Sequence, residues 1–193
     1  MSSFKTIYNE KKKLFKTFNS WNYYFENVSK YSLNEVYKSN KVIIVCDKFF
    51  HHFIYNMDHK DFNKTISEKI KINKKFIKLC KKFETKNFGK KTLGVHFRGT
   101  SYKQSPGHPM PATVNQMISL VKYVIQKDKI EKIFIATEEK NYLKKFKKEF
   151  PNNLVYIKNA YRSDKNDAFK VYPRLNHRYK LGREALIETI LLS

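Results

Sequence analysis

Residues 92–101 read Thr-Leu-Gly-Val-His-Phe-Arg-Gly-Thr-Ser, and they are the strongest indication of the fold in this sequence. The first half is an apolar run typical of a buried β-strand, and the glycine and hydroxyl residues after it are typical of a turn. His96 and Arg98 are two positions apart, so their side chains point to the same face of a strand. Open α/β sheets bind ligands beside the carboxyl ends of their strands. We therefore expect both side chains to face a cleft at the end of a central parallel strand.

Arginine is rare in this chain, which makes Arg98 a stronger candidate for a ligand contact. Of the 40 lysines and arginines only five are arginines, and none precedes position 98. An arginine presents a planar, permanently charged fork that binds phosphate or carboxylate through two parallel hydrogen bonds, which lysine cannot do. Chance or a role as surface charge would also explain the late clustering. The four weaker candidates are Arg162, Arg174, Arg178 and Arg183.

The charge has two interpretations. A formal net charge of +23 favours nucleic acid, anionic lipid or phosphorylated ligands as partners. Alternatively, the lysines cover solvated helix faces, and their spread over almost the whole chain favours this second interpretation.

Other features of the sequence point to a location inside the cell. Cys46 and Cys80 are too few for a disulfide framework, and the start of the chain lacks a signal-peptide pattern. No apolar run approaches the ~20 residues of a membrane helix. We expect a cytoplasmic protein, with peripheral contact to a membrane surface left open. Metal binding by His51, His52 and His59 is disfavoured because their spacing is not that of a metal site.

Alternating strands and helices predict an α/β fold with a parallel sheet covered on both faces. Besides the strand at 92–97, apolar runs predict strands over 41–47, 132–137 and 153–157. Periodicity and capping patterns predict helices over 4–18, 33–38, 62–86, 112–126, 139–150 and 182–193, with the Thr137 hydroxyl capping the fifth. We expect a helical, aromatic N-terminal segment over 1–40 and a Rossmann-like domain over 41–193. The apolar helix at the end would normally lead into another strand, so we expect this domain to continue beyond Ser193.

Three motifs occur in order in the second half of the chain: GVHFRGT at 94–100, IATEE at 135–139, and NHRY at 176–179 leading through Arg183 to Glu188. They resemble motifs of the α-1,6-fucosyltransferase and protein O-fucosyltransferase superfamily, whose first motif is G-V-H-x-R-(R/G)-T-D and whose second is A-T-D-D. The resemblance covers roughly residues 92–193 and, more weakly, 21–47. Ser101 stands where the family has an aspartate.

The resemblance implies a GT-B C-terminal-type domain that binds GDP-fucose. By position, Arg98 would bind the diphosphate and act in catalysis, His96 would contact the nucleoside, and Glu188 would contact the guanine. Further donor-binding positions would be Gly99, Thr100 and Thr137. These roles are chemically reasonable, because an arginine fork can hold a diphosphate without a metal, and a carboxylate can accept both hydrogens of the guanine N1–H/N2–H₂ edge.

We therefore predict an inverting, fucosyltransferase-like enzyme that transfers fucose from GDP-fucose to a hydroxyl of a glycan or protein acceptor. The resemblance implies that no metal or other cofactor takes part. One alternative is a basic nucleic-acid-binding protein, which is disfavoured because no such motif is recognisable. The other is a non-catalytic remnant that binds a nucleotide sugar. A basic pocket around Arg98, with lysines elsewhere, would favour the nucleotide sugar over nucleic acid.

Overall fold

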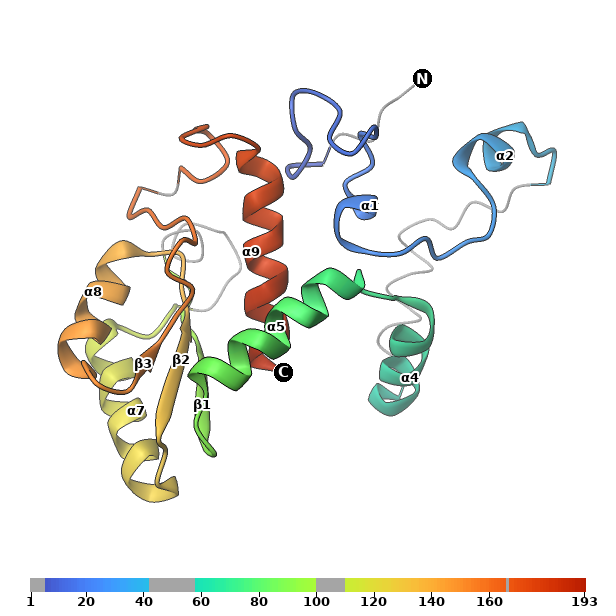
Figure 1. The fold of residues 1–193 in the computed structure, drawn as a ribbon. Coiled ribbons are helices and arrows are strands. Elements are labelled where there is room, and N and C mark those ends of the chain that lie inside the picture. Colours follow the sequence, from blue (N-terminus) through green and yellow to red (C-terminus); the bar gives the residue numbers. More distant parts are fainter. Residues whose placement is uncertain (1–5, 42–57, 100–109, 166) are drawn as a thin grey trace. The chain divides into compact units, whose positions relative to one another are not determined.

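The computed structural model describes residues 6–41, 58–99, 110–165 and 167–193 (Figure 1). The chain forms two compact units, one of residues 21–73 and one of residues 1–20 together with 74–193. The N-terminal segment that we expected to end at residue 40 is thus divided between the two units. Nearly all of the strand predicted over 41–47 lies outside the described residues.

The larger unit contains a parallel sheet of three strands, β1 (Thr92–His96), β2 (Lys132–Ala136) and β3 (Leu154–Val155), in the order β1-β2-β3. Both strand pairs are parallel, which confirms the predicted sheet. Among the described strands β1 lies at an edge of the sheet, and its central position stays a prediction because nearly all of residues 41–47 lie outside the described ranges. The central strand is β2, whose residues 133–136 are all buried, as expected for a strand with neighbours on both sides.

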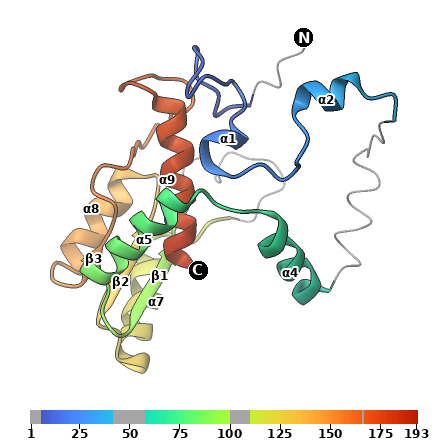
Figure 2. The ribbon, with the colours of Figure 1, turned by 45° about the vertical axis from the view of Figure 1, so that its right-hand side comes forward.

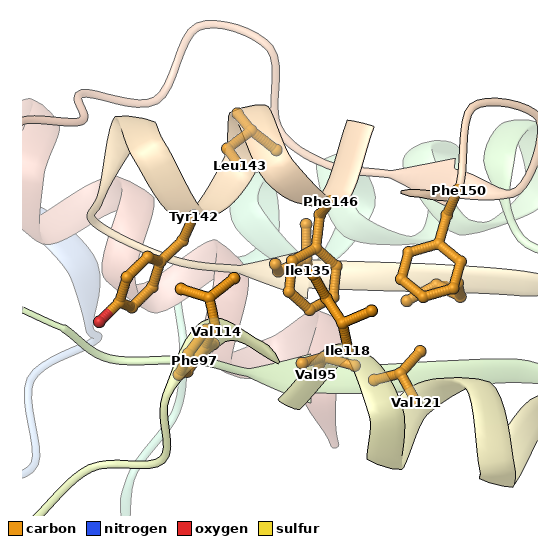
Figure 3. Close-up of a cluster of buried hydrophobic side chains, with 11 residues drawn as sticks. Val95, Phe97, Val114, Ile118, Val121, Ile135, Tyr142, Leu143, Phe146 and Phe150 are labelled. Carbon is orange, nitrogen blue, oxygen red and sulfur yellow. The ribbon is translucent and has the colours of Figure 1, made fainter. Parts of the chain in front are cut away.

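Helices cover both faces of this sheet, as predicted (Figures 1 and 2). The first face is covered by α7 (Val114–Asp128) and α8 (Lys140–Glu149). Buried side chains of both helices pack there against alternate residues of β1 and β2, as Figure 3 shows. Within this cluster the ring of Phe97, just after β1, stacks on that of Tyr142 at 4.2 Å between centroids.

The opposite face is covered by α5 (Lys74–Asn87) and α9 (His177–Leu192). Phe134 of β2 meets Phe83 of α5 there, with ring centroids 6.0 Å apart. Gly94 allows α9 to approach β1, because a Cβ at this position would lie 3.0 Å from Cδ2 of Leu192. Side chains alternate along a strand, so every second residue after Gly94 also faces the side of α9.

The helix predicted over 4–18 is absent from the described part of that range, residues 6–18. The chain turns there instead, and Phe15 and Lys16 have φ values of 52° and 63°. Two consecutive non-glycine residues in the left-handed region are incompatible with a right-handed helix. Contacts of this segment with Tyr179, far along the chain, outweigh its helical periodicity.

The prediction of one long helix over 62–86 is also wrong. Two helices occupy this range, α4 (His59–Lys69) in the smaller unit and α5 in the larger one. Between them, Ile72 forms an isolated β-bridge with Phe25, which requires extended backbone. The smaller unit further contains α1 (Trp21–Tyr24) and α2 (Leu33–Lys38). The capping box predicted for α2 is confirmed, since the Ser32 hydroxyl accepts a hydrogen bond from the amide of Glu35 at 3.2 Å.

The remaining helix boundaries differ by a few residues from the prediction. The N-cap of α8 is Glu139 rather than Thr137, and Thr137 Oγ1 instead accepts a hydrogen bond from the Glu139 amide at 3.3 Å. The last helix, α9, begins five residues earlier than the predicted Gly182, at His177. Within the described ranges, every helix is too short or too polar to span a membrane.

Candidate functional site

A cavity of about 640 Å³ lies at the carboxyl ends of β1 and β2 and is bordered by one face of α9. Four of the residues proposed from the sequence line it together, although they come from three separate segments: His96, Arg98, Thr137 and Glu188. Strand alternation explains the first pair, because His96 and Arg98 follow Gly94 on the face that α9 covers. The α9 positions that line the cavity recur every three or four residues, as expected for one helix face: Leu181, Glu184, Ala185, Glu188, Thr189 and Leu192.

Gly99, another of the proposed residues, is not among the described residues that line the cavity. Gly99 is buried, and its amide lies 3.4 Å from Oε1 of Glu138, which accepts its hydrogen bond. A Cβ at Gly99 would collide with the side chain of Glu139, so packing alone explains a glycine here. Thr100 lies outside the described residues, as does Ser101.

Arg98 is paired with an acidic side chain at the mouth of the cavity. Its Nε lies 3.8 Å from Oε2 of Glu138, and the two side chains are 44% and 38% exposed. An ion pair this long and this exposed contributes about 1 kcal/mol or less. A ligand with a higher negative charge than one carboxylate can therefore compete with Glu138 for the guanidinium.

Glu188 is the most perturbed acid of the cavity. The pKa of its carboxyl is raised to about 7, chiefly by burial and also by the nearby Glu184 and Glu138, while Arg162 acts in the opposite direction. Nη2 of Arg162 lies 3.5 Å from Oε1 of Glu188, and the Arg162 side chain is only 5% exposed.

Backbone carbonyls hold that arginine in place. Its Nη1 donates hydrogen bonds to the carbonyls of Ile157 and Ala160 at 3.0 and 3.2 Å. Arg162 therefore fixes where the Glu188 carboxylate lies in the cavity wall.

A second, half-buried network attaches the loop after β3 to α9. Arg174 binds Glu184 in a bidentate manner, with both N–O distances at 2.7 Å. Its Nε donates to Nδ1 of His177 at 3.2 Å, and Nε2 of His177 donates to the carbonyl of Ala168 at 2.8 Å. Burial lowers the pKa of His177, in agreement with this neutral, doubly hydrogen-bonded ring. The interpretation as surface charge is therefore wrong for both Arg162 and Arg174.

Among the described residues, the cavity around Arg98 is not the basic pocket that would have favoured a nucleotide sugar over nucleic acid. The cavity is lined by four carboxylate residues, Glu138, Asp167, Glu184 and Glu188, and by no lysine. Its charge is nevertheless close to balanced, because arginines pair with the three glutamates. Sequence reasoning missed Glu138 and Glu184 as cavity residues, although the four-residue spacing from Glu184 to Glu188 on a predicted helix could have indicated them. Within the described ranges, His, Cys, Asp and Glu form no group suited to hold a metal ion.

The fold and this site define an α/β protein with a ligand-sized cleft beside the carboxyl ends of parallel strands. No protein-family model and no curated protein matches the chain. Among solved structures, the chain is similar to NodZ α-1,6-fucosyltransferase co-crystallised with GDP, at 16% identity and a TM-score of 0.47, over 82% of this chain and 48% of that one.

Two related structures give similar values. Fucosyltransferase NodZ from Bradyrhizobium matches at 16% identity and a TM-score of 0.46, over the same shares of the two chains. NodZ soaked with GDP-fucose matches at 18% identity and a TM-score of 0.44, over 69% of this chain and 39% of that one. The chain thus spans less than half the length of these enzymes. Similarities at this level concern the course of the backbone and carry no information about activity.

Proposed function

We propose that the cavity binds a guanosine diphosphate sugar, GDP-fucose, and that the protein acts as an inverting fucosyltransferase with a GT-B C-terminal-type domain. The observation that carries this proposal is the convergence of His96, Arg98, Thr137 and Glu188 on one cavity. These residues were selected from sequence motifs that resemble a GDP-fucose-dependent superfamily. His96, Arg98 and Thr137 lie at or just after the carboxyl ends of β1 and β2, where α/β proteins bind nucleotides, and Glu188 faces them from α9.

In this proposal, Glu188 recognises the guanine. An ionised carboxylate accepts hydrogen bonds from both N1–H and N2–H₂ of guanine, whereas uracil presents no such pair of donors. The high pKa of Glu188 indicates that its negative charge is costly at this mostly buried position. Two new donors from the base would lower that cost, so part of the binding free energy would come from stabilising the ionised form.

Arg98 would bind the diphosphate after exchanging its pair with Glu138. A guanidinium holds two phosphate oxygens through parallel hydrogen bonds and keeps its charge at every physiological pH. When an acceptor hydroxyl displaces GDP from the anomeric carbon, negative charge increases on the leaving diphosphate. Arg98 would stabilise that charge, so that the reaction needs neither a metal ion nor another cofactor. His96 and Thr137 border the same space and would complete the contacts to the nucleotide.

The acceptor in this proposal is a hydroxyl of a glycan or protein, and the enzyme works in the cytoplasm. In the described part of the chain, no lysine lines the cavity.

The test is GDP release from GDP-fucose, with acceptor or by slow hydrolysis, for variants of Arg98. We expect both Arg98→Lys and Arg98→Ala to lose roughly 10²- to 10³-fold in rate, because a point charge cannot replace the two parallel donors. Arg183→Lys is the matched control, since Arg183 lies on α9 but does not line the cavity. Near-normal turnover of Arg98→Lys would contradict the assignment of Arg98 to the diphosphate.

A further inference from the structure

A segment far from the sheet in sequence also borders the cavity. The N-terminal arm, defined as residues 6–20, belongs to the same compact unit as the sheet, and its Tyr8 lines the cavity. Phe169, from the loop before α9, lines it as well and is 37% exposed. The two rings touch edge to face, with centroids 5.5 Å apart and planes at 80°. One part of the cavity wall is therefore aromatic.

The arm is attached to the start of α9 by specific contacts. Oε1 of Glu10 accepts a hydrogen bond from the amide of Tyr179 at 2.9 Å. The ring of Phe15 meets that of Tyr179 edge to face, with 5.4 Å between centroids. The ammonium group of Lys11 lies 4.6 Å from the centre of the Tyr172 ring. These contacts explain why the arm turns instead of forming the helix that its sequence pattern predicts.

The Glu10 contact also replaces a cap that α9 lacks. The N-cap residue, Asn176, has a left-handed backbone (φ 52°) and makes no side-chain capping hydrogen bond. Tyr179 is the third residue of α9, and its amide is one of the donors that an N-terminal cap normally satisfies. A carboxylate at this position also interacts favourably with the helix dipole. The arm thus supports the helix that carries Glu184 and Glu188.

We propose that Tyr8 and Phe169 form the aromatic wall against which the base of the bound nucleotide packs, so that the N-terminal arm is part of the nucleotide site. This inference rests on the function proposed above. A base whose edge is held by Glu188 still has two flat faces to cover, and proteins commonly cover such faces with aromatic rings. Packing of this kind is independent of the identity of the base. In this arrangement Glu188 provides the specificity for guanine, and Tyr8 provides affinity for any base.

The test is calorimetric titration of the whole chain and its variants with GDP. Tyr8→Ala should weaken GDP binding roughly 5- to 150-fold, the range for loss of one base-stacking ring. Tyr8→Phe keeps the ring and should bind within about twofold of the unmodified chain. The matched control is Phe18→Ala, because Phe18 is 40% exposed on the same arm and does not line the cavity. Thermal unfolding of each variant establishes that it is folded.

A double-variant cycle separates base packing from simple support of the fold. Glu10→Ala should also weaken GDP binding, because it releases the arm from α9, and Glu10→Gln should retain most of the affinity because an acceptor remains. In a Tyr8→Ala background, however, Glu10→Ala should have little further effect on GDP binding. Fully additive losses would mean that Glu10 acts on the site through α9 alone, and would overturn the inference that the arm contributes to binding by placing Tyr8 against the base.

The outcomes distinguish this inference from the function on which it rests. If the unmodified chain binds GDP and folded Tyr8→Ala binds it equally well, the aromatic wall is refuted while the proposed function stands. If the unmodified chain binds no GDP, the proposed function fails and this inference fails with it. A Tyr8→Trp variant adds a direct readout, because its extra fluorescence should change on addition of GDP, whereas the unmodified chain should show no such change.

Discussion

The pKa of Glu188 predicts how GDP binding depends on pH. Burial raises this pKa to about 7, so about 9% of the carboxyl groups are ionised at pH 6 and about 91% at pH 8. Only the ionised form accepts both hydrogens of the guanine edge. The affinity for GDP should therefore increase about tenfold from pH 6 to pH 8, and this increase should level off at higher pH.

The assay is calorimetric titration with GDP at half-unit steps of pH, for the unmodified chain and for Glu188→Gln. The terminal phosphate of GDP also titrates near pH 6, but its contribution is common to both proteins and cancels in their ratio. The ratio of the two affinities should follow a single titration centred near pH 7. A ratio that is constant over this pH range would refute the role of the Glu188 carboxylate in guanine binding.

Three further predictions follow from the same geometry. Glu138→Gln should strengthen GDP binding about fivefold, because it removes a carboxylate that pairs with Arg98 at 3.8 Å and repels phosphate. Unchanged or weaker binding of GDP in calorimetric titration would contradict this. The pKa of Glu188 is higher in the folded protein than its ordinary value of 4.5, so the carboxyl stabilises the fold below pH 4.5 and this stabilisation is lost as pH rises through about 7. Between pH 4.5 and pH 8, the unmodified chain should thus lose about 3 kcal/mol more free energy of unfolding than Glu188→Gln, as measured by urea denaturation. If the free energies of unfolding of the two proteins change with pH in the same way, this prediction is wrong. Gly99→Ala should cost about 1–3 kcal/mol of stability, because the Cβ of the new alanine would meet the buried side chain of Glu139. A Tm equal to that of the unmodified chain would contradict this and show that Glu139 can move away.

The parts of the fold that depend on local pattern were predictable from the sequence. The apolar runs at 92–97 and 132–137 give two neighbouring parallel strands because short buried runs between helices have few other stable arrangements. The common direction of His96 and Arg98 follows from strand alternation alone, and both line the cavity.

The parts that depend on distant contacts were not predictable. The pattern of residues 4–18 is helical, but contacts of Glu10 and Phe15 with Tyr179, more than 160 residues further along the chain, stabilise a different backbone. The order β1-β2-β3 of the described strands depends on which strands pair with one another, and the pattern of a single strand does not contain that information. The rarity of arginine made Arg162 and Arg174 weaker candidates for a ligand contact, but it could not indicate that each pairs with a glutamate of α9.

The most direct test of the central proposal is calorimetric titration of the unmodified chain with GDP and with UDP at pH 8, where Glu188 is mostly ionised. The two nucleotides share the diphosphate and ribose and differ in the base, so the difference in affinity isolates recognition of the guanine. We expect GDP to bind roughly 5- to 150-fold more tightly, the range for one charged hydrogen-bonding partner. Equal affinities for GDP and UDP, or no binding of either, would contradict the proposal that this cavity is a guanosine diphosphate sugar site.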